Sequence, residues 1–306
     1  MYVGIDIGGT KCAVVLGDAK GNIVKKLRFE TADKEETLAR IFDAVEQMGD
    51  FDRIGISCGG PLDEKKGVIL SPPNLPSWDH VSIVDMLEER FHVPARIMND
   101  ANACAVAEWR FGAGVGAESM IFLTFGTGLG AGLILDGRLF SGGNGFAGEV
   151  GHIRLADHGP AGYGKSGSFE GFCSGSGLRE IGRGFAREYI QRGQMPSFIT
   201  EASLDTFTVA QMADAARKGD RCALDAFDLC GKMLGKGLAI LCDTLNPDVV
   251  VIGSVYERCR DLLEENTLKW LGQEALPAVA AHVRVLPAAL GDRIGDLAAL
   301  AVAMEY

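Results

Sequence analysis

Several features are missing from this chain of 306 residues. No run of 18 or more apolar residues occurs, so no segment is a candidate for a transmembrane helix. The start of the chain, MYVGIDIGGTK, lacks a basic stretch, a long apolar core and a cleavage site. It is therefore expected to form a strand and not a signal peptide. These absences predict a cytoplasmic protein.

The chain has fewer positively charged than negatively charged residues. The 30 Lys and Arg residues face 41 Asp and Glu residues, which gives a formal net charge of −11 at pH 7. Nucleic acids are bound through basic surfaces that neutralise phosphates. The charge balance therefore predicts that no nucleic acid is a partner, and the lack of a long apolar run predicts that no membrane is one.

Paired cysteines are also missing. None of the eight cysteines forms a C-x-x-C pair, so neither a zinc ribbon nor a thioredoxin-type motif is supported. They are scattered, mostly through apolar segments, and we expect reduced, buried thiols.

Glycine, in contrast, is abundant: it occupies 41 of the 306 positions, against a usual share of roughly 7%. The glycines concentrate at 4–9, at 55–60 and between 112 and 184, and no Gly/Ser/Pro tract resembles a flexible linker. Inside folded segments, glycine permits positive φ or lets the backbone approach a ligand.

The residue pattern predicts an α/β fold. Apolar and β-branched runs indicate strands at 2–7, 12–16, 23–29, 53–57 and 95–98. Apolar spacing of i, i+3, i+4 and i+7 predicts a helix over 35–48. Further helices are expected over 84–91 and 101–111, and the chain is mainly helical from about residue 172, apart from a buried strand at 249–252.

The opening pattern returns near residue 120. A strand at 120–125, a glycine turn at 126–128, a strand at 129–135 and an Asp-Gly turn repeat it, with Gly8 falling on Gly126 at an offset of 118 residues. Two copies of one hairpin predict an internally duplicated protein with two related lobes. Chance recurrence of two glycine hairpins is the alternative.

The first glycine turn, Asp6-x-Gly8-Gly9-Thr10-Lys11, lies between two strands. Its backbone N–H groups could bind a phosphate, Thr10 and Lys11 add a hydroxyl and a charge, and Asp6 could hold a hydrated Mg²⁺. The segment is not a Walker A loop, which opens a helix. A plain hairpin turn remains the alternative.

The second turn, Gly126-Thr-Gly128-Leu-Gly-Ala131, matches the dinucleotide fingerprint G-x-G-x-x-A in letters. That fingerprint requires a helix directly after the turn. Here a strand and an Asp-Gly turn follow, which is typical of hairpins. The context argues against a dehydrogenase and favours a second turn that faces phosphate.

Asn99 and Asp100 stand at the end of a strand, where a helix begins. A carboxylate there could accept the proton of a substrate hydroxyl that attacks a phosphate. Asp is also a favoured helix cap, so a capping role stays open.

Three further polar residues surround glycine loops: Glu149 and His152, in Gly148-Glu-Val-Gly-His152, and Glu170 beyond the loop 162–167. A di-iron bundle would need two Glu-x-x-His copies on long helices, and only one copy is present, in a loop. Together with Asn99 and Asp100, these residues suit a ligand with many hydroxyls, although each alone could be a solvated surface residue.

Six segments in this order resemble the ROK family of sugar kinases and repressors. They are Asp6-Ile-Gly-Gly-Thr-Lys11, Pro73-Asn-Leu-Pro-Ser-Trp78, Asn99-Asp-Ala-Asn-Ala103, Phe125-Gly-Thr-Gly-Leu-Gly130, Gly148-Glu-Val-Gly-His152 and Gly164-x-x-Gly167-x-x-Glu170.

The resemblance implies an actin-like (ribonuclease H-like) ATPase fold, duplicated, with two lobes around a central cleft. The implied lobes are a small N-terminal α/β lobe over 1–115, completed by a C-terminal helix at 291–306, and a larger α/β lobe over 116–290. The implied reaction transfers the γ-phosphoryl group of ATP, with Mg²⁺, to a sugar hydroxyl, usually on C6 of a hexose. Family habit also implies a homodimer.

The resemblance further assigns roles to residues of this chain. Asp100 would be the general base. The implied sugar contacts are Asn74, Asn99, Asp100, Glu149, His152 and Glu170. The implied Mg-ATP phosphate contacts are Asp6, Gly8, Gly9, Thr10, Lys11, Gly126, Thr127 and Gly128, with Gly253 and Ser254 near the adenosine.

One departure concerns zinc. Many family members hold a structural zinc with a His and three Cys in a C-x-C-G-x-x-G-C-x-E segment, and the cysteine positions here are Ala161, Tyr163 and Ser168. A His without thiolates does not hold structural zinc, so we predict none. We expect packing by Tyr163 and Phe169 to hold the loop instead. A rearranged site that uses Cys173 and His158 is the alternative.

The leading function is phosphorylation of glucose or a close relative. Kinases of N-acetylmannosamine, N-acetylglucosamine or fructose remain alternatives within the family. A sugar-sensing regulator without catalysis is the alternative from another class. Such regulators carry a helix-turn-helix module before the kinase-like part, whereas here the phosphate motif begins at residue 6 of an acidic chain.

Overall fold

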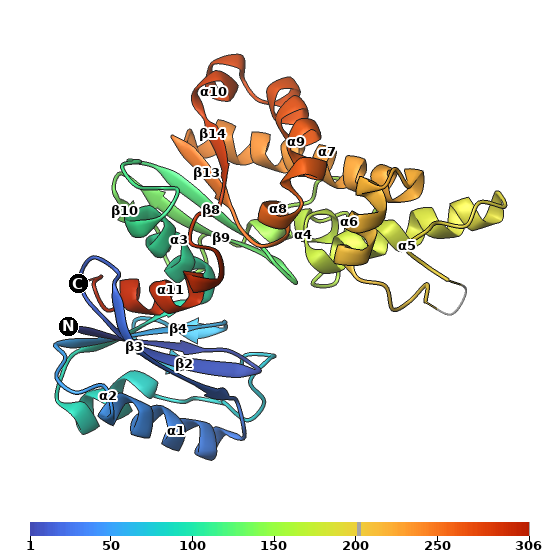
Figure 1. The fold of residues 1–306 in the computed structure, drawn as a ribbon. Coiled ribbons are helices and arrows are strands. Elements are labelled where there is room, and N and C mark those ends of the chain that lie inside the picture. The colour runs from blue at the N-terminus through green and yellow to red at the C-terminus, as the bar shows by residue number, and fades with distance from the viewer. Residues whose placement is uncertain (201–202, 306) are drawn as a thin grey trace. The chain divides into compact units, whose positions relative to one another are not determined.

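The computed structural model describes residues 1–200 and 203–305; Tyr306, the last residue of the predicted C-terminal segment, lies outside them. The chain divides into two compact units. Unit 1 comprises 1–117, 132–147 and 289–306, and unit 2 comprises 118–131 and 148–288. Figure 1 shows the elements of each unit along the chain.

The first sheet lies in unit 1 and has the strand order β3-β2-β1-β4-β7. β1 pairs antiparallel with β2, β2 pairs antiparallel with β3, and β4 lies parallel to both β1 and β7. The strands are β1 (Tyr2–Ile7), β2 (Lys11–Gly17), β3 (Ile23–Glu30), β4 (Arg53–Cys58) and β7 (Ala95–Asn99).

The second sheet repeats this plan with the order β10-β9-β8-β13-β14. β13 lies parallel to β8 and β14, as β4 does to β1 and β7. The β9–β10 hairpin turns through Asp136 and Gly137, both with positive φ, as a two-residue hairpin loop requires. The strands are β8 (Met120–Phe125), β9 (Leu129–Leu135), β10 (Arg138–Leu139), β13 (Val249–Ile252) and β14 (Arg284–Pro287). The shared order confirms the predicted duplication.

Helices cover both faces of the first sheet. Figure 1 shows α1 (Lys34–Glu46) and α2 (Ile83–Phe91) on one face and α11 (Ile294–Val302) on the other. Glycine in the strands lets α11 approach closely: a Cβ atom at Gly55 would lie 2.2 Å from the Ala303 nitrogen, and one at Gly4 would lie 2.6 Å from the Leu300 nitrogen. Part of the glycine excess therefore serves packing.

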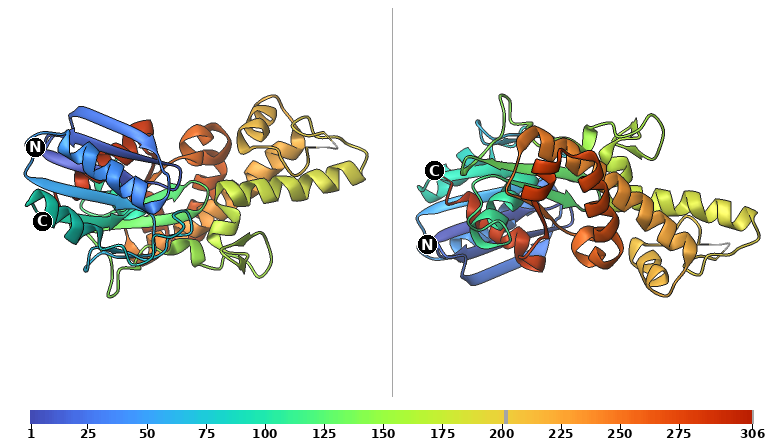
Figure 2. Two further views of the ribbon diagram at one scale, coloured as in Figure 1. Left: turned by 90° about the horizontal axis from the view of Figure 1, so that it is seen from below. Right: turned by 90° about the horizontal axis from the view of Figure 1, so that it is seen from above.

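Unit 2 is largely helical, as predicted. α7 (Arg221–Leu245) packs against α9 (Arg260–Glu274), and a Cβ atom at Gly235 would lie 2.4 Å from the Thr267 carbonyl oxygen. Figure 2 shows the last turns of α5 (Gly175–Gln191) extending beyond the other helices of this unit. The remaining helices are η1 (Val150–His152), α4 (Phe169–Phe172), α5 (Gly175–Gln191), α6 (Val209–Arg217), α8 (Val255–Arg258) and α10 (Pro277–His282).

Most predicted elements are present. β8, β9 and β13 have the predicted bounds, and α1 and α3 (Asp100–Phe111) differ by at most two residues at their ends. β14 was not predicted, because a four-residue strand that ends in Pro leaves little pattern. Two hairpins of two-residue strands were also not predicted: β5 (Leu62–Asp63) with β6 (Val68–Ile69), and β11 (Ala161–Gly162) with β12 (Lys165–Ser166).

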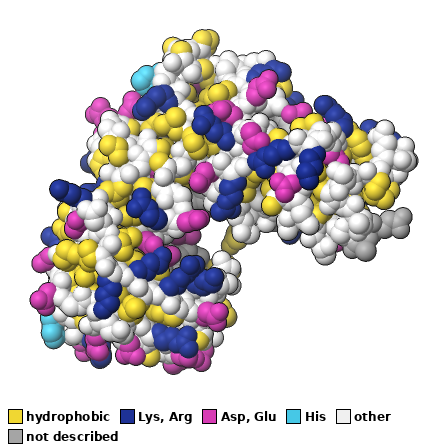
Figure 3. Space-filling view, viewed as in Figure 1, with side chains coloured by type: hydrophobic (Ala, Val, Ile, Leu, Met, Phe, Trp, Pro, Cys, Tyr) yellow, Lys and Arg dark blue, Asp and Glu magenta, His cyan; other side chains and the backbone are white. Residues whose placement is uncertain are grey.

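Two expectations from composition can be compared with the structure. All eight cysteines are free, seven of them buried and Cys104 half-buried, as expected. Within 1–200 and 203–305, no helix is both long and apolar enough for a membrane crossing. On the face shown in Figure 3, Lys and Arg side chains stand among Asp and Glu side chains.

Candidate active site

In unit 1, the junction between β7 and α3 presents Asn99 and Asp100. Asn99 occupies the cap position, where its Oδ1 atom accepts a hydrogen bond from the Ala101 N–H at 3.0 Å. Asp100 is the first helical residue, and its Oδ1 atom accepts from the same N–H group at 2.9 Å. The cap position is thus filled by the neighbouring residue, and the Asp100 carboxylate stays accessible to solvent.

The surroundings of Asp100 favour its protonated form. Desolvation by the protein atoms around the carboxyl raises its pKa, and the hydrogen bond from Ala101 offsets part of that rise. Asp100 is exposed as a residue, whereas protein atoms surround its carboxyl group closely enough for desolvation to be the largest cause of the raised pKa. A carboxylate with a raised pKa is a stronger base than an ordinary aspartate.

Glu64, which was not among the predicted site residues, supports this junction. Its Oε1 atom accepts a hydrogen bond from the Asn99 N–H at 2.8 Å and lies 3.5 Å from Nδ2 of the buried Asn102. Glu64 directly follows β5, a strand too short to be predicted. The only sequence signal was a carboxylate close behind the glycine loop at 59–60.

The first glycine turn lies against the loop that carries Asn74. A Cβ atom at Gly9 would lie 2.5 Å from the Asn74 carbonyl oxygen, so only glycine permits this approach. The turn closes through a hydrogen bond from the Gly8 N–H to the Lys11 carbonyl at 3.1 Å, and Thr31 donates its hydroxyl proton to the Gly8 carbonyl at 2.7 Å. The structure thus brings together a predicted phosphate turn and a predicted sugar residue.

Asp6 precedes this turn on β1 and faces the first turn of α11. A Cβ atom at Gly295 would lie 2.7 Å from Oδ2 of Asp6. Burial, followed by repulsion from Asp296 and Asp100, raises the pKa of Asp6 to about 6, although Lys26 and Arg28 act in the opposite direction. Asp296 itself forms an ion pair with Lys26. Asp6 therefore belongs to the same electrostatic environment as Asp100.

The raised pKa of Asp6 predicts a pH-dependent cost in stability. A folded-state pKa of about 6, above the ordinary value of 3.8, means that the native state binds more protons than the unfolded state between these values. Stability is therefore lost as pH rises from about 4 to 6, by about 1–3 kcal/mol. We therefore expect Asp6→Asn to have a higher free energy of unfolding than the wild type at pH 7.5 and the same free energy at pH 4. Denaturant unfolding in the presence of EDTA measures both values. A difference between the two proteins that is the same at both pH values would contradict this prediction.

In unit 2, the second glycine turn contacts Glu170. The Oε2 atom of Glu170 accepts a hydrogen bond from the Leu129 N–H at 3.0 Å, and a Cβ atom at Gly128 would lie 2.7 Å from that oxygen. The turn itself joins β8 to β9, so a strand and not a helix follows it, as predicted.

The residues predicted near the adenosine also lie beside this turn. Ser254 follows Gly253 after β13, and a Cβ atom at Gly126 would lie 4.0 Å from the Ser254 Oγ atom. Ser254 has φ +56°, an uncommon conformation for a residue other than glycine. Strained residues of this kind concentrate at functional sites.

Glu149 and His152 flank η1 and are both exposed. The His152 ring meets the Tyr163 ring edge-on, with 5.2 Å between centroids. Lys165 donates a hydrogen bond from Nζ to the His152 carbonyl at 2.6 Å. The loop after His152 thus folds back onto it.

The three cysteine positions of the family's zinc site do not hold zinc-binding side chains here. Ala161, Tyr163 and Ser168 supply no thiolate, and Cys173, the alternative, is buried with its thiol directed at the Cys230 carbonyl 3.7 Å away. Among residues 1–200 and 203–305, no group of three or more His, Cys, Asp or Glu side chains is arranged to hold a metal ion. This donor chemistry does not fit structural zinc.

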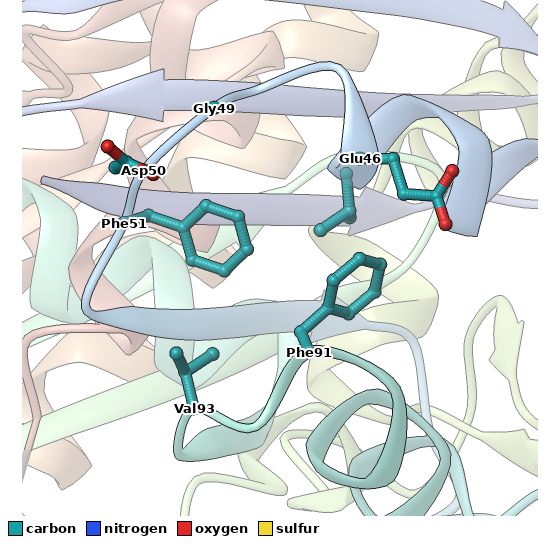
Figure 4. Close-up of a pocket in the computed structure, with 7 residues that line it drawn as sticks. Glu46, Gly49, Asp50, Phe51, Phe91 and Val93 are labelled. Carbon is teal, nitrogen blue, oxygen red and sulfur yellow. The ribbon is translucent and has the colours of Figure 1, made fainter.

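A pocket of about 340 Å³ lies elsewhere in unit 1, near the ends of α1 and α2 (Figure 4). The rings of Phe51 and Phe91 lie 6.1 Å apart in it. None of its lining residues is a predicted site residue. The lining consists of Val45, Glu46, Gly49, Asp50, Phe51, Phe91 and Val93.

Two sheets of one strand order, each with a glycine turn after its first strand, define an actin-like ATPase fold. The model of the ROK family matches residues 2–305, and the chain belongs to that family.

Three relatives illustrate the range of the family. The chain is similar to the glucokinase of Thermotoga maritima, with 30% identity over 99% of this chain and 97% of that protein. It is similar to the crystal structure of a ROK family glucokinase from Streptomyces griseus in complex with glucose and AMPPNP, with TM-score 0.78, 33% identity, and 100% and 99% of the two chains covered. It is also 30% identical to the xylose repressor of Caldicellulosiruptor bescii, over 99% of this chain and 78% of the repressor.

Proposed function

We propose that this ROK protein transfers the γ-phosphoryl group of ATP to the C6 hydroxyl of glucose or a closely related hexose. The chain is an ATP-dependent sugar kinase, in keeping with its glucokinase relatives. The observation that carries the proposal is Asp100, a solvent-accessible carboxylate with a raised pKa at the start of α3.

In the proposed reaction, Asp100 accepts the proton of the sugar hydroxyl as the hydroxyl oxygen forms a bond to the γ-phosphorus. The bond from that phosphorus to the β–γ bridging oxygen breaks, and ADP leaves. Mg²⁺, when bound with ATP, would neutralise phosphate charge, and Asp6 would hold it through water.

The other predicted residues keep binding roles in this proposal. Asn74, Asn99, Glu149, His152 and Glu170 would hydrogen-bond sugar hydroxyls. The two glycine turns, with Thr10, Lys11 and Thr127, would face the phosphates, and Gly253 and Ser254 would face the adenosine. A homodimer in the cytoplasm is part of the proposal, and sedimentation of the purified protein tests the dimer.

The second candidate is a sugar-responsive regulator without catalysis, because a repressor relative aligns with 99% of this chain, although this chain covers only 78% of that repressor. A panel of sugars separates the two. Glucose, mannose, fructose, N-acetylglucosamine and N-acetylmannosamine are each supplied with Mg-ATP, and ADP release is followed. We expect the highest kcat/KM with glucose. Sugar binding by calorimetry without any ADP release would support the regulator, and a preference for an N-acetylated sugar or fructose would replace the proposed substrate.

A further inference from the structure

Ser168 is fully buried in unit 2. Along the sequence it lies between the predicted sugar residues His152 and Glu170. Its Oγ atom accepts hydrogen bonds from two backbone N–H groups, that of Gly162 at 3.2 Å and that of Gly171 at 3.1 Å. The bond from Gly171 caps α4, the short helix whose first turn carries Glu170. The bond from Gly162 connects that cap to the β11–β12 hairpin.

The bond to Gly162 bears directly on Glu170. A Cβ atom at Gly162 would lie 2.7 Å from both Cβ of Glu170 and the Gly171 nitrogen, so this backbone packs on the stem of the Glu170 side chain. On its other side, Glu170 accepts the Leu129 N–H. The Glu170 carboxylate is thus held between a loop fixed by Ser168 and the second glycine turn.

The backbone at Ser168 also reaches the segment that follows His152. Ser168 forms an antiparallel bridge with Arg154, and the Phe169 N–H donates to the Ile153 carbonyl at 2.7 Å. Phe169 is buried and packs on α7, where a Cβ atom at Gly237 would lie 2.3 Å from its ring. The expected packing by Phe169 is therefore present, whereas Tyr163 is 81% exposed and contributes only its ring contact with His152.

The rest of the loop closes through similar bonds. The Gly167 N–H donates to the Pro160 carbonyl at 3.0 Å, and the Gly167 carbonyl accepts the Leu155 N–H at 2.9 Å. The Ser166 hydroxyl donates to the Gly159 carbonyl at 2.9 Å. Ser166 is exposed, however, so water can replace its bond, whereas the N–H groups bound to Ser168 are shielded from water.

We infer that Ser168 is a positioning residue: its buried hydroxyl holds Glu170 in place for sugar binding, in a loop that needs no metal, and the backbone at Ser168 and Phe169 fixes the segment that follows His152. The inference rests on the proposed function, because it assumes that these residues contact the sugar. An unpaired buried N–H group costs free energy, so without the hydroxyl the loop is expected to relax away from this geometry.

The test compares glucose and ADP binding by calorimetry in four proteins: wild type, Ser168→Ala, Ser168→Thr and Ser166→Ala. We expect Ser168→Ala to weaken glucose binding by at least about tenfold and ADP binding by less than about threefold. Ser168→Thr, which keeps the hydroxyl, should recover most of the glucose affinity, and Ser166→Ala should match the wild type. General destabilisation would weaken both ligands together.

The outcomes separate the inference from the proposed function. Wild-type glucose affinity in Ser168→Ala would overturn the inference and leave the kinase assignment intact. Equal loss of both ligands, or one zinc ion per chain in the purified wild type by elemental analysis, would overturn it as well. A wild type that neither binds nor phosphorylates glucose would contradict the proposed function and, with it, this inference.

Discussion

Replacement of Asp100 by Asn is expected to lower kcat for glucose phosphorylation by roughly 10²–10⁴-fold, the usual contribution of a general base. Asn has nearly the same shape and keeps an oxygen that can accept the Ala101 N–H, so α3 should start as before. What it loses is the ability to take the proton of the attacking hydroxyl. Glucose affinity by calorimetry should therefore change by less than about threefold, while kcat from ADP release falls.

A matched control is available in α2. Asp85 also lies in the first turn of its helix and is exposed, but it belongs to no predicted site. Asp85→Asn should retain wild-type kcat and glucose affinity. A kcat of Asp100→Asn within about threefold of the wild type would rule out the general-base role, because the loss of a general base lowers kcat by roughly 10²-fold or more.

The hairpins could be predicted from sequence because their signals are local. Glycine turns and apolar runs fixed the bounds of β8, β9 and β13, and the repeated pattern revealed the duplication. The sequence left open a capping role for Asp100, whereas in the structure the cap is Asn99, one residue earlier. At such a boundary, two adjacent polar residues satisfy the same local rule, and only the backbone conformation decides between them.

The contacts that support the site could not be predicted, because they join distant parts of the chain. Glu64 binds the Asn99 N–H across 35 positions, and Glu170 binds the Leu129 N–H across 41. No periodicity or spacing encodes such a pair. Gly9 is a similar case: its sequence context indicated a turn, whereas the close approach of Asn74 depends on the path of a separate loop.

Glu108 presents the strongest expected effect on stability. It is fully buried at the end of α3, where its Oε1 atom accepts the N–H groups of Ala289 and Leu290, each at 2.9 Å. Its Oε2 atom accepts the Ala113 N–H at 2.8 Å. The carboxylate thus joins α3, which begins with Asp100, to the segment that leads into α11. Of the predicted site residues of unit 1, Asp100 begins α3 and Asp6 lies close to Gly295 in the first turn of α11.

Replacement of Glu108 by Ala should leave three backbone N–H groups without their acceptor and open a cavity. We expect a loss of roughly 3–5 kcal/mol in the free energy of unfolding of unit 1. Glu108→Gln keeps one acceptor oxygen but turns an NH₂ group toward a backbone N–H, so about 1–3 kcal/mol should be lost. Denaturant unfolding in a Trp270→Phe background measures this, because the other two tryptophans, Trp78 and Trp109, both belong to unit 1.

The exposed Glu89 of α2 gives the matched control for this experiment, because it lies in the same unit as Glu108 and the two reporting tryptophans. Glu89→Ala removes the same side chain from a solvent-exposed helix position and should change stability by less than about 0.5 kcal/mol. A loss of stability in Glu108→Ala as small as that of the control would mean that water can replace the carboxylate as the acceptor of these three N–H groups. The three hydrogen bonds would then contribute little to stability. The decisive result is therefore the order of the free energies of unfolding. If the acceptor cannot be replaced, stability should rise from Glu108→Ala through Glu108→Gln to the wild type, whereas an acceptor that water can replace predicts no difference among the three.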